Sequence, residues 1–197
     1  MDSGPLSPAS CRVRGGQLRT QDEARFRAFV EDRRGALLRT AYLLCGDRHD
    51  AEDLTQATLI KVYTAWGRVS EADNPDGYVR RVLVNTHHSR ARRRRVSEFL
   101  TDRLPDRAGL DSTAALAGRS VLMAALARLP ITQRTVVVLR YWEGRPDVEV
   151  AQILGKPVGT VRSRAARGLA RLREDPHMAD LITRRPAPAQ RTTEARS

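Results

Sequence analysis

Apolar residues recur every three to four positions from about residue 21 to residue 95, which is the spacing of one face of an α-helix. The first run ends where Gly46 and Asp47 interrupt the pattern. Gly35 lies inside this run, and the pattern leaves open whether it separates two helices or is tolerated within one. The apolar positions of the run are Phe26, Phe29, Val30, Leu37, Leu38, Ala41 and Tyr42.

Two more helices are expected in the same stretch. Asp50 opens the first of them, which has acidic residues in its first turn, as the helix dipole favours, and runs to Trp66. Its apolar residues lie on more than one face, a pattern that fits a central core helix and also fits a helix docked on a partner protein. A loop over 67–76 ends in the turn signal Asn74-Pro75-Asp76-Gly77, and the other helix follows from Tyr78.

A second helical pattern runs from about residue 113 to residue 174. Its first helix ends at Pro130, and Thr132 is placed to cap the next one. The run from Val136 to Leu139 has strand propensity, but no partner strand is visible nearby, so we expect a helix there too. The apolar stripe of the first helix is Leu122, Ala125, Leu126 and Leu129.

The stretch 147–173 has the pattern of a helix-turn-helix unit. Asp147 is placed to cap a helix over 148–154, and a second helix runs from about residue 158 to Arg173. Between them, Gly155 supplies the positive φ that such a turn requires. The inward positions are Ala151, Leu154, Val161, Ala165, Leu169 and Leu172, and the outward ones are Arg162, Ser163, Arg167 and Arg171, with Arg164 near the flank. A basic outer face of this kind fits a DNA major groove, the alternative being the solvated surface of a helical bundle.

Together these patterns predict an all-α fold of two small helical domains joined by a flexible linker. The expected boundaries are a disordered arm over 1–20, a first domain over 21–95, a linker over 96–112, a second domain over 113–175 and a disordered tail over 176–197. With such a linker, the two domains are expected to behave independently in the free protein.

Charge indicates the class of partner. Lys and Arg number 35 against 23 Asp and Glu, which gives a net charge of +12 and a pI near 11.1. A GC-rich genome would explain why all but Lys61 and Lys156 of the basic residues are arginine, but not the excess of bases over acids. A polyanion is the expected partner, with nucleic acid favoured over an acidic membrane surface.

Other classes of function find little support in the chain. The cysteines, Cys11 and Cys45, are too few for a disulfide framework or a zinc site, and Cys45 lies in an apolar run that predicts a buried thiol. The four histidines have no metal-ligand spacing, and there is no phosphate-binding loop or nucleophile elbow, so we expect no enzyme, metal or cofactor. Without a signal peptide or a span of about 18 apolar residues, the chain is expected to be cytoplasmic and off the membrane.

Five arginines crowd into the six residues from Arg90 to Arg95, where a helix is expected to end. Cations at a helix C-terminus complement the helix dipole, so a structural role is one interpretation. Five exceed what that role needs, which favours contact with phosphates.

Four segments carry a family resemblance. Asp50-Ala51-Glu52-Asp53-Leu54-Thr55-Gln56-Ala57-Thr58 resembles the core-polymerase-binding signature of region 2 of sigma factors. The segments 129–134, 139–144 and 158–164 resemble region 4, in the right order and spacing. The chain is therefore identified as similar to the extracytoplasmic-function (ECF) sigma factors, and most of all to the actinobacterial SigE-like subfamily. A conventional helix-turn-helix regulator and an RNA-binding helical protein are the alternatives.

The resemblance implies partners and roles. RNA polymerase core and promoter DNA would be partners, an anti-sigma factor would be a third, and the linker would thread toward the RNA-exit channel. Polymerase contacts would be Asp53, Leu54, Gln56, Ile60 and Tyr63. The single-stranded minus-ten element would be held by Arg80, Arg81, Asn85, Thr86, Arg92, Arg93 and Arg94. The minus-thirty-five duplex would be read by Thr160, Arg162, Ser163, Arg164 and Arg167.

Overall fold

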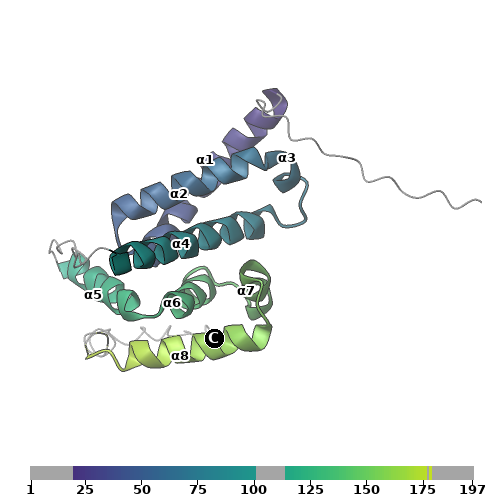
Figure 1. Cartoon of the computed structure of the whole chain (residues 1–197). Coiled ribbons are helices and arrows are strands. Elements are labelled where there is room, and N and C mark those ends of the chain that lie inside the picture. Colours follow the sequence, from purple (N-terminus) through teal and green to yellow (C-terminus); the bar gives the residue numbers. More distant parts are fainter. Residues whose placement is uncertain (1–19, 101–113, 177, 179–197) are drawn as a thin grey trace, which may run out of the picture.

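The structure is a computed structural model that describes residues 20–100, 114–176 and 178. Within these ranges every regular element is helical and none is a strand, which confirms the all-α prediction. The helices form an N-terminal block (residues 20–100) and a C-terminal block (residues 114–176), which lie one above the other in Figure 1. Nearly all of the predicted arm and tail, and residues 101–112 of the predicted linker, lie outside the described residues.

The N-terminal block consists of α1 (Thr20–Cys45), α2 (Arg48–Thr64), α3 (Trp66–Val69) and α4 (Pro75–Leu100). α1 continues through Gly35, which settles the question that the pattern left open. α2 begins two residues before Asp50, because the Asp47 carboxylate caps it by accepting a hydrogen bond of 2.9 Å from the Asp50 backbone N–H. Asp47 thus interrupts the first helix and starts the second.

The loop predicted over 67–76 is shorter at both ends. Its first residues belong to the single turn α3, which buries Trp66 and Val69. At its other end α4 starts at Pro75, three residues before the predicted start, because Asn74 accepts a hydrogen bond of 2.7 Å from the Gly77 N–H and proline suits the first helical position. α4 also continues to Leu100, past the position where the linker was expected to begin.

The C-terminal block consists of α5 (Ala114–Arg128), α6 (Ile131–Val137), the π-helical segment η1 (Val138–Trp142), α7 (Asp147–Leu154) and α8 (Val158–Arg173). The run from Val136 to Leu139 is helical and buried, as predicted against its strand propensity. Both predicted caps are wrong. Thr132 lies inside α6, which starts directly after Pro130, and Asp147 is the first residue of α7 rather than its cap.

The helix-turn-helix unit is formed by α7 and α8. Gly155 ends α7 in the left-handed region, with φ +59° and ψ 43°, and its N–H and that of Lys156 return to the last turn of the helix, as the sequence predicted. Gly168 brings α8 close to α6, since a Cβ there would lie 2.7 Å from Val137 Cγ2. Nothing in the local sequence pattern indicates that position 168 requires glycine.

The two blocks share buried apolar surface. Buried residues of α1 pack in one cluster with buried residues of α5 and α6, and Val84 of α4 packs with residues of α6 to α8. α4 therefore lies between its own block and α7, an arrangement visible in Figure 1. The α1 members of the shared cluster are Leu37, Ala41, Leu43 and Leu44, and the members from the C-terminal block include Met123, Leu126, Leu129 and Val138. The structure thus shows the blocks packed together, not apart as independent domains would be.

Candidate nucleic-acid and protein interfaces

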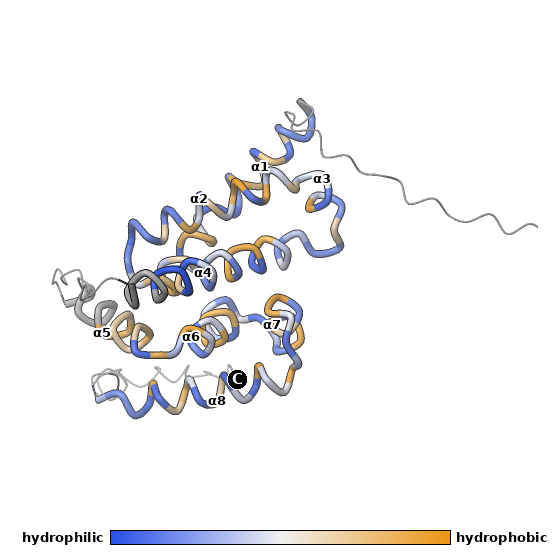
Figure 2. The backbone as a smooth tube through the Cα atoms, viewed as in Figure 1, coloured by the Kyte–Doolittle hydropathy of each residue, from blue (hydrophilic) through white to orange (hydrophobic). Residues whose placement is uncertain are grey.

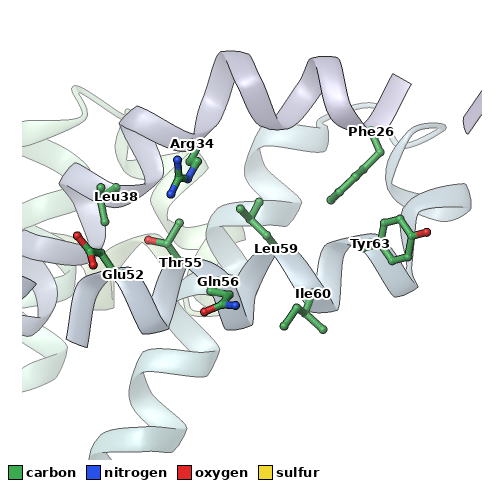
Figure 3. Close-up of a pocket in the computed structure, with 9 residues that line it drawn as sticks. All are labelled: Phe26, Arg34, Leu38, Glu52, Thr55, Gln56, Leu59, Ile60 and Tyr63. Atoms are coloured by element: carbon green, nitrogen blue, oxygen red, sulfur yellow. The ribbon is translucent and has the colours of Figure 1, made fainter. Parts of the chain in front are cut away.

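A groove of about 550 Å³ lies between α1 and α2 (Figure 3). Apolar side chains form much of its lining, and Ile60 at its edge is 58% exposed, which is unusual for a large aliphatic residue. Arg34 and Glu52 add charge at the rim. A groove of this composition suits docking of a helix from another protein. The remaining lining residues are Phe26, Leu38, Thr55, Gln56, Leu59 and Tyr63.

Three of the five predicted polymerase contacts, Gln56, Ile60 and Tyr63, line this groove. Asp53, Gln56 and Ile60 are exposed on α2 at helical spacing. Tyr63 is half-buried, with its ring 5.0 Å from that of Phe26 in an edge-on contact. Leu54 is fully buried, because a step of one residue along the helix turns it away from Asp53 and into the core. Leu54 is therefore not available to a partner in this structure, and its assignment as a polymerase contact stays a prediction.

Three residues predicted to hold the minus-ten strand are engaged inside the protein. Arg80 is buried and forms an ion pair with Glu143 of the C-terminal block. Arg81 is exposed but donates a hydrogen bond to the backbone oxygen of Gln152 in α7. Thr86 is buried and lies 3.0 Å from the Lys61 amino group. In this conformation Arg80 and Thr86 are buried and do not face solvent, and their assignment to the minus-ten element stays a prediction.

The arginine run on α4 divides into two kinds of residue. Arg94 pairs with Asp50 through both terminal guanidinium nitrogens, Nη1 and Nη2. Arg90 donates to the Asp53 backbone oxygen at 3.1 Å. The hydrogen bond from Arg94 holds the pKa of Asp50 below its ordinary value. Arg92 and Arg93 are exposed, in the hydrophilic stretch that Figure 2 shows toward the C-terminal end of α4. Among residues 90–94, whose side chains the structure describes, Arg92 and Arg93 are therefore the arginines that are free to meet phosphates.

The outer face of α8 carries the residues predicted to read duplex DNA. Arg167 donates to the Ser163 backbone oxygen and to its hydroxyl, both at 3.2 Å, so these two exposed residues form one polar unit. Arg162 is exposed too, and donates to Asp147 Oδ2 at 3.0 Å. Thr160 and Arg164 are half-exposed on the flanks. The helix therefore presents donors in a row beside the turn, as direct reading of base edges requires.

Comparison with known families and proteins shows which family the chain belongs to. The model of sigma-70 region 2 matches residues 29–96, and the model of sigma-70 region 4 matches residues 119–172. The RNA polymerase sigma-E factor of Streptomyces avermitilis is 43% identical over 159 residues, covering 81% of this chain and 89% of that protein. The chain belongs to the ECF sigma factors of the sigma-70 family. Within them it is SigE-like, since the sigma-E factor of Streptomyces coelicolor is 42% identical over 81% of this chain and 90% of that protein.

Solved structures agree with the fold of this sigma factor. Sigma factor RpoE of Bartonella quintana, solved in complex with the anti-sigma factor NepR, has a TM-score of 0.64 and 24% identity over 80% of this chain and 98% of that one. CnrH, in complex with the cytosolic domain of CnrY, has a TM-score of 0.54 and 22% identity over 82% of this chain and 89% of that one. The N-terminal block thus corresponds to region 2 and the C-terminal block to region 4.

Two titratable residues of the sigma factor, Cys45 and His87, lie largely inside the protein. Burial raises the pKa of the Cys45 thiol to about 12 and lowers the pKa of His87 to about 4, so both are neutral at pH 7. Their side chains approach to 3.8 Å between Sγ and Nδ1. In the described part of the chain, no group of three His, Cys, Asp or Glu residues could hold a metal ion. No helix in that part is long and apolar enough to cross a membrane.

The sequence pattern missed the partners of two acidic residues that organise these surfaces. Glu143 receives hydrogen bonds from Thr40 and Arg80 of the region 2 block. Asp147 receives one from Arg162 and pairs with Arg140 at 2.9 Å. Glu143 directly precedes a turn glycine and Asp147 was expected only as a helix cap, and neither position indicates an ion pair, because the partners lie elsewhere in the sequence.

Proposed function

We infer that this chain is a promoter-specificity subunit, which directs bacterial RNA polymerase core to its promoters and helps to open them. Support comes from the presence of both sigma regions in order along one chain, each with an exposed surface of suitable chemistry. The basic outer face of α8 is the observation that carries the proposal, because a sigma factor that reads duplex DNA needs such a face.

Polymerase core binds along the α1–α2 groove in this proposal. Asp53, Gln56 and Ile60 supply the contact, because their side chains are exposed beside the apolar lining of the groove and are not part of the buried core. Tyr63 contributes the edge of its ring, which α1 holds in place. Leu54 acts indirectly, by seating α2 in the core.

Both regions contact promoter DNA in this proposal. Asn85, Arg92 and Arg93 on α4 are available to the single-stranded minus-ten element in the present conformation, whereas Arg80 and Arg81 first have to leave their partners in the C-terminal block. On α8, the Ser163–Arg167 unit, with Arg162 and Arg164 beside it, reads the minus-thirty-five duplex.

The same family membership supports a setting and a second protein partner. Solved structures of the same fold include complexes with anti-sigma factors, and we propose a partner of that kind here. Polymerase works in the cytoplasm, which is where the chain would act. The chemistry of RNA synthesis belongs to the polymerase core, so the chain has no reaction of its own to catalyse.

Co-purification with polymerase core tests the proposal. The full chain should bind core stoichiometrically and support run-off transcription from promoter fragments, whereas a conventional helix-turn-helix regulator would bind promoter duplex alone. Asp53→Ala with Gln56→Ala should weaken core binding while changing folding stability by no more than about 0.5 kcal/mol. Glu174→Ala, which removes an exposed acid at the end of α8, is the control and should leave core binding unchanged. Full core affinity in the double variant would contradict the assigned surface.

A further inference from the structure

The Asp147 carboxylate joins the two helices of the helix-turn-helix unit. Asp147 is the first residue of α7, directly after Pro146, and its side chain is 15% exposed. Arg162, in the second turn of α8, donates from Nε to Asp147 Oδ2 at 3.0 Å. The Arg162 side chain is 69% exposed. A charge-assisted hydrogen bond thus ties a solvent-facing arginine to a carboxylate that the protein largely covers.

Arg140 holds the same carboxylate from its other oxygen. The Arg140 Nε lies 2.9 Å from Asp147 Oδ1, and its guanidinium lies over the Tyr141 ring, with Cζ 5.1 Å from the ring centroid. Asp147 therefore has a cation at each of its oxygens and is not free to turn away from α8. Two arginines around one carboxylate leave a net positive charge, so the group does not repel DNA phosphates.

The contact leaves the outer end of Arg162 available. Its Nη1 and Nη2 donate to no residue in the described part of the chain. A guanidinium reads guanine with two of its nitrogens, which donate to O6 and N7 of the base. Because Asp147 occupies Nε, the pair that remains for such a contact is the end-on pair, Nη1 and Nη2. Arg167 differs, since its Nε and Nη2 donate back to Ser163 on its own helix.

We propose that Asp147 is a positioning residue, which fixes Arg162 for end-on reading of a guanine in the minus-thirty-five duplex. The inference rests on the proposed function for the identity of that duplex. A free arginine side chain loses rotamer freedom when it binds a base, and this loss weakens binding. Asp147 restricts the side chain before DNA arrives, so less freedom is lost on binding. The benefit goes to the base that the fixed guanidinium can reach, and it therefore appears as sequence preference.

Transcription by holoenzyme from a library with a randomised upstream element tests the proposal. The wild type should prefer guanine at one position, and Arg162→Ala should remove this preference, which one bidentate contact sets at about 5- to 150-fold. Asp147→Ala should reduce the same preference about 2- to 10-fold, since one side chain is no longer held in place. Asp147→Asn should lie between Asp147→Ala and the wild type, because an amide oxygen can still accept from Nε.

Glu149→Gln is the matched control. Glu149 is also an acid in the first turn of α7, but it pairs at 2.7 Å with Arg145, which precedes both helices of the unit. This variant should leave the base preference unchanged. If Asp147 served only the fold, its loss would lower transcription at all promoters alike, so the readout is the preference at one position and not the rate. Thermal unfolding shows which variants fold, and Asp147→Asn decides if Asp147→Ala does not.

Two further variants show whether Asp147 acts through Arg162. Asp147→Ala combined with Arg162→Ala should give the same base preference as Arg162→Ala alone. Arg162→Lys keeps the charge but lacks the planar fork, so it should lose the guanine preference, and retention of that preference would overturn the bidentate reading.

The preference of Asp147→Ala decides the inference. An unchanged guanine preference overturns it, and so does a stronger one, which would show that Asp147 holds Arg162 away from DNA. A wild type that selects upstream sequences without a guanine preference dependent on Arg162 overturns it too. A wild-type holoenzyme that selects no upstream sequence at all would instead refute the proposed function.

Discussion

The close crossing of α6 and α8 makes a quantitative prediction about the recognition helix. In Gly168→Ala the new Cβ would lie 2.7 Å from Val137 Cγ2, well inside van der Waals contact. Val137 is buried and β-branched, so it cannot rotate away. Overpacking of this kind costs about 1–3 kcal/mol, and the better helix propensity of alanine returns about 1 kcal/mol. We expect a net loss of stability of up to about 2 kcal/mol.

Thermal and urea unfolding of the full chain measures this loss, and Gly35→Ala is its control. Gly35 is also a mid-helix glycine, but its added Cβ would meet only the flexible end of Arg39 at 3.5 Å, so that variant should gain up to about 1 kcal/mol. Each 1 kcal/mol should move the Tm by about 2–4 °C. Adding Val137→Ala should recover about 1 kcal/mol of the Gly168→Ala loss as a coupling energy. If Gly168→Ala raises the Tm as Gly35→Ala does, the close crossing is refuted.

Further predictions concern pH and DNA. Because the folded pKa of His87 is about 4, the unfolded chain takes up its proton first, and stability should fall by up to about 3 kcal/mol between roughly pH 6.5 and pH 4. His87→Gln should flatten that fall in urea titrations, and an unchanged pH profile would count against the buried neutral imidazole. Arg167→Ala should relax base preference at one or two positions in transcription from a randomised upstream element, at about 1–3 kcal/mol per lost bidentate contact. Arg92→Ala with Arg93→Ala should weaken holoenzyme at all promoters alike and reduce the salt slope by about 0.7–0.9 per lost phosphate contact. An unaltered salt slope would show that Arg92 and Arg93 are only solvated residues at the end of the helix.

Local patterns in the sequence predicted the helices and the helix-turn-helix well, because each depends on residues near one another. Gly155 is the clearest case, since the turn needs a left-handed residue and glycine adopts that conformation without strain. Helix ends were less predictable. Thr132 and Asp147 both have capping chemistry, yet prolines directly before their helices set the starts instead.

Contacts between distant residues were beyond the pattern. Glu143 and Thr40 are 103 residues apart, and nothing local marks either as a partner of the other. The burial of Leu54 was not foreseen because a motif names consecutive residues, whereas a helix directs neighbouring residues to different faces. Gly168 looked like one more glycine in a helix, and only the position of Val137 explains it.

The arginine excess has a different meaning once its partners are known. Arg80 and Arg94 are bound to carboxylates, and Arg134 donates to the backbone oxygens of Leu44 and Ala127, so these side chains hold the fold together. The net charge of the chain therefore overstates the positive charge that is free to contact DNA in this conformation. Groups of exposed arginines remain on α8 (Arg162 and Arg167) and near the end of α4 (Arg92 and Arg93), so each region has one such group. Because Arg80 is paired with Glu143 of the C-terminal block, the charge available to promoter DNA depends on whether the two regions are together or apart.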